Sequence, residues 1–381
     1  MIVAGEASAD LHGSNLVKAI RRSDPGVTFW GIGGKRMERA GVKILVPCSE
    51  MAVVGVTEVL VRLRTIAKAR RRLKSILKYH NPDLLILLDY PEFNLNLAGI
   101  ARRFRVPVLY YISPQVWAWR TGRVRKIARR VDRMAVILPF EERFYRERGV
   151  RVDFVGHPLM DVVECAMGLR PGGSAECGSK GVPPGPSGIR RPVVGLLPGS
   201  RREEIRNLLP SMVKSVEILK GRYEGIQCLL PLAETIDREF VQHFIHNSSV
   251  KIEVLEGDIY KVLSLCNVAV VTSGTATLEA AIMGVPMVIV YRVSPISYWV
   301  GKMVAKVPYI GLVNLVAGKK VVPELIQNEV LPERLSHEVM NILEDNEVRE
   351  NMIKNLISVK ESLGKGGASE RTAQLALGMM R

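Results

Sequence analysis

The chain has 381 residues, 47% of them hydrophobic, which is enough to bury the cores of two α/β domains. Its formal net charge of +16 implies an anionic partner, such as nucleic acid, a membrane surface or a phosphorylated substrate. No apolar run reaches the roughly 18 residues that span a bilayer, and the 5 cysteines include no Cys-x-x-Cys pair. We therefore expect a protein of the reducing cytoplasm, without a transmembrane helix or a zinc site.

The N-terminal part of the chain predicts a strand over Met1–Gly5, followed by the loop Glu6–Asp10 and a first helix. Further on, Arg62–Lys78 is a basic amphipathic helix with leucine and isoleucine at helical spacing. Its basic face could simply be solvated, or it could dock on anionic lipid headgroups. Recognition of nucleic acid fits less well, because the segment lacks interleaved aromatic residues and a helix-turn-helix context.

An aspartate follows the next predicted strand. Leu84–Leu88 is a continuous apolar run, typical of a buried parallel strand, and it ends at Asp89. The carboxyl end of a parallel strand is where α/β proteins place their chemistry, so Asp89 is a candidate general base. It could equally cap the helix that we expect to begin near Phe93.

A strand predicted over Val106–Ile112 leads into the loop 113–120, with the sequence SPQVWAWR. The paired tryptophans and the arginine of this loop could stack on a sugar or cover acyl chains, or they could pack on the sheet. Residues 168–189 are rich in Gly, Pro and Ser and cannot bury a core. We interpret them as a linker between two domains.

Two strand–turn–helix units in the second domain are typical of anion sites. Val193–Leu197 is followed by PGSR (198–201), and Val268–Val271 is followed by TSGT (272–275), with Ser or Thr as candidate N-cap. Free N–H groups and the helix dipole favour phosphate at such turns. We infer that one nucleotide diphosphate lies between the two turns, with Arg201 as counter-charge and Glu279 placed for a ribose diol. Neither turn has the dinucleotide or P-loop fingerprint, and an ordinary helix start would explain either one alone.

Nine segments in this order resemble the lipid-A-disaccharide synthases, a family of bacterial glycosyltransferases with the GT-B architecture. The segments are GEASAD (5–10), GIGGKRM (31–37), MAVVGVTEVL (51–60), DYPEFN (89–94), SPQVWAWR (113–120), FVGHPLMD (154–161), LLPGSRREEI (196–205), SGTATLEAAIMGVPMVIVYR (273–292) and VPYIGLVNLVAG (307–318). The resemblance covers nearly the whole chain. The PGSR and SGTATLE turns alone would also fit other nucleotide-sugar enzymes of this architecture.

The resemblance implies an α/β fold of the GT-B type, in which two Rossmann-like, doubly wound domains face a cleft. Residues 1–167 would form the domain that faces the acceptor and the membrane, and 168–189 the linker. Residues 190–345 would bind the UDP-sugar. The C-terminal helices, 346–381, would pack back on the first domain or on a partner chain.

The resemblance also implies transfer of 2,3-diacylglucosamine from its UDP conjugate to 2,3-diacylglucosamine 1-phosphate, giving lipid A disaccharide 1-phosphate and UDP. In an inverting displacement, Asp89 would take the proton of the attacking hydroxyl, and Arg201 would meet the charge on the departing UDP. The nucleotide-sugar site would comprise Gly199, Ser200, Ser273, Gly274, Thr275, Ala276, Glu279 and Asn314. The first loop and acceptor site would comprise Glu6, Ser8, Asp10, Trp117 and Arg120.

The chain contains no Asp-x-Asp motif, so we expect no catalytic metal and no cofactor. Because both substrates are acylated, the resemblance favours a peripheral protein on the cytoplasmic face of the inner membrane. It leaves a homodimer open. Ala9 stands where the family usually has glycine and would be strained if that position needs a positive φ. The side chains expected to face the membrane are Arg64, Lys68, Arg70, Arg71, Arg72 and Lys74.

Two other classes of protein remain as alternatives. The first is another GT-B enzyme that uses UDP-GlcNAc, either a transferase or a 2-epimerase; the paired tryptophans and the basic apolar helix favour acylated substrates instead. The second is a basic nucleic-acid-binding protein, which only the net charge suggests and which would show salt-steep binding unaffected by UDP.

Overall fold

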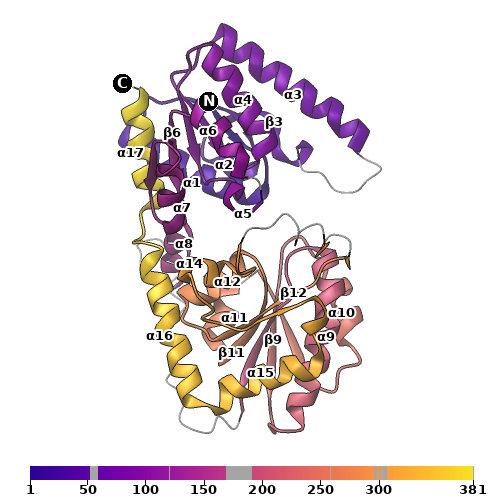
Figure 1. Cartoon of the computed structure of the whole chain (residues 1–381). Coiled ribbons are helices and arrows are strands. Elements are labelled where there is room, and N and C mark those ends of the chain that lie inside the picture. The colour runs from indigo at the N-terminus through magenta and orange to yellow at the C-terminus, as the bar shows by residue number, and fades with distance from the viewer. Residues whose placement is uncertain are drawn as a thin grey trace. The chain divides into compact units, whose positions relative to one another are not determined.

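The computed structural model describes residues 1–51, 59–119, 121–168, 191–257, 259–295, 298–299, 302 and 307–380. It divides into two compact units, Met1–Pro158 with Leu363–Arg381 and Leu159–Ser362. Each unit contains one parallel sheet with helices packed on it (Figure 1). None of the helices in the described ranges is long and apolar enough to cross a bilayer.

The first unit is built on a sheet of 7 strands in the order β3-β2-β1-β4-β5-β6-β7, all paired in parallel. The winding reverses between β1 and β4, so their carboxyl ends are the switch point where doubly wound folds open a crevice for ligands. The strands are β1 (Ile2–Ala4), β2 (Phe29–Gly33), β3 (Val42–Pro47), β4 (Leu85–Leu88), β5 (Val108–Tyr111), β6 (Arg133–Val136) and β7 (Val152–Phe154).

Helices cover both faces of this sheet because its strands are apolar on both sides. Leu85 and Leu87 join one buried core, and Ile86 and Leu88 join the other. The first core is closed by α3 (Val59–Tyr79), α4 (Pro91–Arg103), α6 (Val124–Arg130) and α7 (Pro139–Arg146). The second core is closed by α1 (Ala7–Ser23), α2 (Lys35–Arg39) and α17 (Ala368–Met380). Shorter turns are α5 (Val116–Trp119), η1 (Cys48–Glu50) and η2 (Thr121–Arg123).

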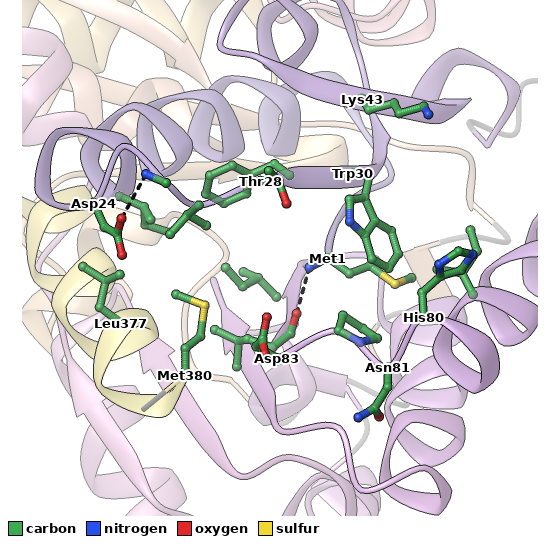
Figure 2. Close-up of a pocket in the computed structure, with 18 of the residues that line it drawn as sticks. Met1, Asp24, Thr28, Trp30, Lys43, His80, Asn81, Asp83, Leu377 and Met380 are labelled. Carbon is green, nitrogen blue, oxygen red and sulfur yellow. Dashed lines mark hydrogen bonds between the residues drawn. The ribbon is translucent and has the colours of Figure 1, made fainter.

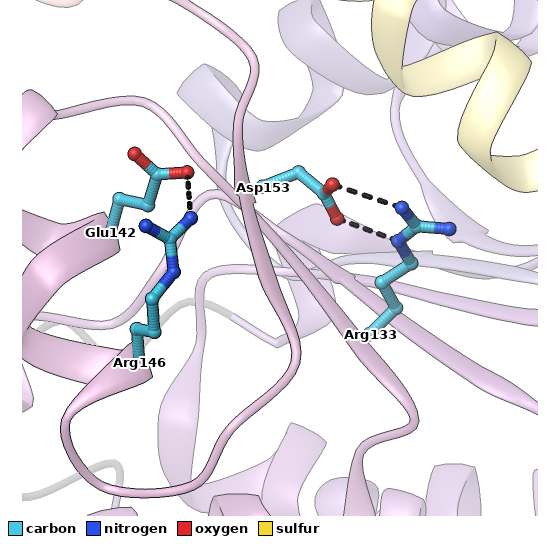
Figure 3. Close-up of polar contacts among 4 residues, drawn as sticks. All are labelled: Arg133, Glu142, Arg146 and Asp153. Carbon is cyan, nitrogen blue, oxygen red and sulfur yellow. Dashed lines mark hydrogen bonds and ion pairs between the residues drawn. The ribbon is translucent and has the colours of Figure 1, made fainter.

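An arginine pins the edge strand of the first sheet. Arg133 on β6 makes a bidentate ion pair with Asp153 on β7, with nitrogen–oxygen distances of 2.6 and 2.9 Å (Figure 3). On the neighbouring helix α7, Arg146 pairs with Glu142 one turn earlier, at 2.7 Å. A bidentate arginine–carboxylate pair is geometrically specific, so the first pair sets where β7 lies against β6.

The last helix, α17, packs on α1 and returns the end of the chain to the first unit. Ala373 and Ala376 are buried in the second core. The guanidinium of Arg371 donates to three carbonyl oxygens, those of Val155, Lys365 and Gly366, at 2.8 to 2.9 Å. Arg371 thereby ties the segment before α17 to the end of β7.

The second unit has the same winding. Its sheet of 6 parallel strands runs β10-β9-β8-β11-β12-β13, with the switch point between β8 and β11. The strands are β8 (Val193–Leu197), β9 (Gln227–Leu232), β10 (Ile252–Glu256), β11 (Val268–Thr272), β12 (Met287–Tyr291) and β13 (Glu324–Ile326). The helices are α8 (Leu159–Ala166), α9 (Arg202–Lys220), α10 (Arg238–Ile245), α11 (Ile259–Leu265), α12 (Thr275–Ile282), α14 (Leu312–Ala317), α15 (Pro332–Glu344) and α16 (Asn346–Ser362), with the turn η3 (Gln327–Glu329).

The boundaries of the units differ from the domains expected from the sequence. Helix α8, placed before residue 167 in the first domain, packs on α12 and belongs to the second unit. Helix α16 packs on α12, α14 and α15 and also belongs to the second unit, so α17 alone of the C-terminal helices lies on the first. The predicted linker, 168–189, lies outside the described residues except for its first position.

Candidate active site

A cavity of about 420 Å³ opens in the second unit at the switch point between β8 and β11. Its volume lies in the range of small-molecule sites. The turns after β8 and β11 line it, together with residues after β9 and β10. All but one of the predicted nucleotide-sugar residues lie on its wall: Gly199, Ser200, Ser273, Gly274, Thr275, Ala276 and Glu279. Arg201, predicted to meet the charge on the departing UDP, lies there as well.

The turn after β8 already holds a carboxylate. Glu204, three residues into α9, accepts hydrogen bonds from the backbone amides of Ser200 and Arg201 at 3.2 and 3.3 Å. Its other oxygen pairs with the Arg201 guanidinium at 3.1 Å. Gly199, with φ +108°, makes room, since a Cβ there would lie 2.2 Å from the Glu204 carboxylate. A phosphate bound at this turn would therefore have to replace Glu204 as the acceptor of these hydrogen bonds. This role of Glu204 was not predicted from the sequence, although Arg201-x-x-Glu204 has the spacing of a capping box.

The turn after β11 has no side-chain cap. The N-cap of α12 is Gly274, so the expectation of a Ser or Thr cap is wrong. The Ser273 hydroxyl donates to the carbonyl oxygen of Ile310 at 2.9 Å, and the Thr277 hydroxyl donates to that of Gly274 at 2.7 Å. The Ser273 hydroxyl thus fixes a loop, and the Thr277 hydroxyl bonds back within the first turn of the helix, so neither caps the amides at the start of α12.

Of the two remaining predicted residues, Glu279 lines the cavity and Asn314 does not. Glu279 lines the cavity, accepts a hydrogen bond from the Tyr260 hydroxyl at 2.8 Å, and has its pKa raised by burial. Asn314 is fully buried and does not reach the cavity. Its side chain accepts from the amides of Val321 and Val322 and donates to Val322 and Glu324, at 2.8 to 3.0 Å. Asn314 is therefore the one predicted nucleotide-sugar residue that does not line the cavity, because its side-chain hydrogen bonds hold a loop.

Asp89 lies at the switch point of the first unit, directly after β4. Burial and the nearby Glu6 raise the pKa of its carboxyl from the usual 3.8 to about 6. The N-cap of α4 is Tyr90, so Asp89 does not cap that helix. A partly buried carboxyl with a pKa near neutrality, beside the end of β1, is suited to taking a proton.

The first loop is more structural than the sequence suggests. The segment after Glu6 is the first turn of α1, where Ser8 is exposed and Ala9 is buried. Ala9 does not have a positive φ, so the condition under which it would be strained is not met. The carboxylate of Asp10 is buried and accepts hydrogen bonds from three amides at the start of α2, at 2.7, 3.1 and 3.1 Å. Asp10 therefore caps α2 from a distance.

Trp117 is also structural. Only 7% of it is exposed, its indole nitrogen donates to the Glu141 carboxylate at 2.9 Å, and its ring packs edge-on against Phe140. The interpretation of Trp117 as a platform for sugar or acyl chains is wrong, because the ring faces the interior. Arg120, predicted beside it, lies outside the described residues.

The predicted membrane-facing helix, α3, has one buried stripe, formed by Ala69, Leu73 and Leu77. Its sequence contains no acidic residue. The side chain of Arg64 lies outside the described part, and Arg72 donates to the carbonyl oxygen of Leu45 at 2.7 Å. The remaining predicted cations are all exposed: Lys68, Arg70, Arg71 and Lys74.

A second cavity, of about 940 Å³, lies at the opposite, amino-terminal edge of the first sheet (Figure 2). Trp30, Lys43, His80 and Asp83 line it together with Met380 of α17. It contains none of the predicted site residues. Doubly wound sheets bind ligands at the carboxyl ends of their strands, so this cavity is not the candidate active site.

Solved structures with the same architecture define the fold class. A UDP-GlcNAc 2-epimerase from Neisseria meningitidis, bound to UDP-GlcNAc, matches with a TM-score of 0.64 at 12% identity, over 97% of each chain. MurG from Acinetobacter baumannii matches with a TM-score of 0.55 at 13% identity, over 99% of this chain and 98% of that one. The chain thus has the GT-B fold of paired Rossmann-like units.

The family follows from the sequence relatives. A family model described as lipid-A-disaccharide synthetase matches residues 1–377. Lipid-A-disaccharide synthases from Geobacter metallireducens and Geobacter sulfurreducens are 51% and 50% identical over 380 residues, covering 100% of this chain and 97% of each relative. The chain belongs to the lipid-A-disaccharide synthase family and is a glycosyltransferase of lipid A biosynthesis.

Proposed function

We propose that the chain condenses UDP-2,3-diacylglucosamine with 2,3-diacylglucosamine 1-phosphate, with inversion at the anomeric carbon. The products are lipid A disaccharide 1-phosphate and UDP. The observation that carries this proposal is the position of the two sets of candidate residues. The nucleotide-sugar residues line one cavity at the switch point of the second unit, and Asp89 stands at the switch point of the first.

The cavity of the second unit would hold the UDP part of the donor. The start of α12, which has no side-chain cap, and the amides of the turn after β8 offer N–H groups to the two phosphates. Arg201 would exchange Glu204 for phosphate and stabilise the charge that builds on UDP as the bond to the sugar breaks. Glu279, directed by the Tyr260 hydroxyl, would accept hydrogen bonds from the ribose.

Asp89 would act as the general base. It takes the proton from the 6-hydroxyl of the acceptor as that oxygen attacks the anomeric carbon from the side opposite UDP. A pKa of about 6 leaves Asp89 ionised at neutral pH and still basic enough to accept a proton. The acceptor and donor carry acyl chains, and we propose that exposed cations of α3 hold the protein at the anionic inner-membrane surface where such substrates reside.

Replacing the proposed base tests this mechanism. Asp89→Asn keeps the shape of the side chain and removes its basicity, so we expect kcat to fall at least 100-fold, on the scale of general-base catalysis. UDP binding by the second unit, measured by calorimetry, should stay within about twofold of the wild type. Turnover close to that of the wild type would exclude Asp89 as the base.

A further inference from the structure

Two buried side chains converge on the main chain at Asp89. The hydroxyl of Tyr110 on β5 donates to the carbonyl oxygen of Asp89. The amide nitrogen of Asn94 in α4 donates to the same oxygen at 2.7 Å and to that of Leu88 at 3.0 Å. Neither Tyr110 nor Asn94 has any exposed surface. Both therefore act on the backbone of Asp89 from inside the fold, where a donated hydrogen bond is strongest.

The two polar atoms of the Asn94 side chain differ in their hydrogen bonding, and the difference indicates the role of this residue. Among the described residues, Asn94 Oδ1 is buried and has no hydrogen-bond partner, whereas its nitrogen makes two bonds. A buried acceptor without a partner destabilises the fold, so Asn94 can stabilise it only through the hydrogen bonds that its side-chain nitrogen donates. Those bonds end on the two carbonyl groups at the end of β4.

The backbone that these donors hold is strained. Asp89 has φ +44° and Tyr90 has φ +46°, two successive non-glycine residues in the left-handed region. Non-glycine residues rarely adopt this conformation, and it persists only where its surroundings impose it. Tyr90 is held as well, because its hydroxyl donates to the carbonyl oxygen of Met51 at 3.1 Å and its ring lies against Gly5.

We propose that Tyr110 and Asn94 are positioning residues, which hold the strained backbone so that the Asp89 carboxyl stays at the switch point. This inference rests on the proposed role of Asp89 as general base. Burial and the charge of Asp89 keep the pKa of Tyr110 well above its usual value, so the hydroxyl remains a donor at neutral pH. Without the two donors, the left-handed turn relaxes and the carboxyl moves toward water.

The test is a pH profile of a variant that loses only one hydroxyl. In Tyr110→Phe the ring stays and the donor goes, so we expect kcat to fall about tenfold or more with an unchanged KM for the UDP-sugar. The acid limb of the kcat profile should move down from about pH 6, because a hydrated Asp89 regains a lower pKa. Glu6, ahead of α1, is the charged group that acts on this pKa, and Tyr110 is the titratable group that responds to Asp89.

Tyr111→Phe is the matched control. Tyr111 is the next residue of β5, is equally buried, and belongs to the opposite core of the sheet. It should keep the wild-type kcat and acid limb. Identical profiles for Tyr110→Phe and Tyr111→Phe would overturn the proposal.

A second variant covers the case in which Tyr110→Phe folds poorly. Asn94→Leu has a similar volume and no donor, and it should shift the acid limb in the same direction; an unshifted limb in folded Asn94→Leu would also overturn the proposal. Failure of the proposed function is distinguishable, because Asp89→Asn itself would then stay active. That result removes the base role and the positioning role with it.

Discussion

Asp89 is held in an environment that favours reactivity over stability. Its carboxyl is partly buried beside Glu6, and its backbone is left-handed. The first feature raises the free energy of the folded state when the carboxyl is ionised, and the second raises it in either protonation state. A residue that destabilises the fold and lies at a switch point is typical of functional sites.

The cost of Asp89 predicts that its removal stabilises the fold. The folded pKa, about 6, lies above the usual 3.8, so the folded state binds the proton more tightly than the unfolded chain. The stability that protonation gives is complete below about pH 3.8 and is lost as the pH rises through about 6. Asp89→Asn avoids this loss, which is about 3 kcal/mol for a pKa difference of about two units, and should unfold at a temperature a few degrees above the wild type at pH 8.

Calorimetric melting of both proteins between pH 4 and pH 8 checks this expectation. The difference in Tm should shrink toward zero near pH 4, where the wild-type carboxyl is protonated too. A variant that is less stable at pH 8 would show that the ionised carboxylate contributes net stability to the fold.

At the scale of single residues, the sequence indicates which side chains carry suitable functional groups, but not which hydrogen-bond partners those groups have. Arg201 and Glu279 line the cavity of the second unit, and both follow strand–turn–helix signals that local sequence specifies. Asn314, Trp117 and Asp10 carry the same kinds of functional groups, yet each is satisfied by groups distant in sequence or hidden in the core. Which partner a buried polar group finds is decided by tertiary packing, which a residue pattern does not contain.

At the scale of elements, apolar runs gave accurate boundaries. The strands expected at 193–197 and 268–271 are observed as Val193–Leu197 and Val268–Thr272, and the helix expected at 62–78 as Val59–Tyr79. The start of α1 differs from the expectation. The sequence predicts a loop over Glu6–Asp10, whereas α1 begins at Ala7, because alanine is as compatible with a helix as with a turn.

The exposed cations of α3 predict that the protein binds to an anionic membrane surface. Arg70 and Lys74 are exposed and one turn apart, on a helix that buries Leu73 and Leu77 in the core. Charge reversal in Arg70→Glu/Lys74→Glu should lower the affinity for anionic vesicles about tenfold or more, because each basic residue near such a surface contributes about 1 kcal/mol. Co-sedimentation with phosphatidylglycerol vesicles at several salt concentrations measures this.

The control for this experiment changes the net charge equally but elsewhere. Lys214 and Lys354 are exposed on helices of the second unit, and Lys214→Glu/Lys354→Glu should bind vesicles as the wild type does. Binding of the wild type should also weaken as salt rises. Equal loss in both double variants would indicate a response to net charge alone, and binding insensitive to salt would indicate apolar insertion.

On the scale of the whole molecule, the chain contains two units that share one doubly wound topology, and the proposed reaction uses residues of both units. The first unit carries the candidate base and the basic helix, and the second carries the cavity with the nucleotide-sugar residues. The GT-B class was predictable from the resemblance of nine segments to one family, whereas apolar periodicity by itself indicates only strand–turn–helix units. The boundaries of the two units were harder to predict, because α8 and α16 belong to the second unit through the helices that they contact and not through a signal in their own sequences.

The most direct test of the account is turnover of UDP-2,3-diacylglucosamine with 2,3-diacylglucosamine 1-phosphate in the presence of EDTA, followed by release of UDP. We predict release only when both acylated substrates are present, with formation of the disaccharide 1-phosphate and no dependence on added metal. Equal release from unacylated UDP-GlcNAc would keep the fold and contradict the proposed substrates. No release with both acylated substrates would contradict the proposed reaction itself.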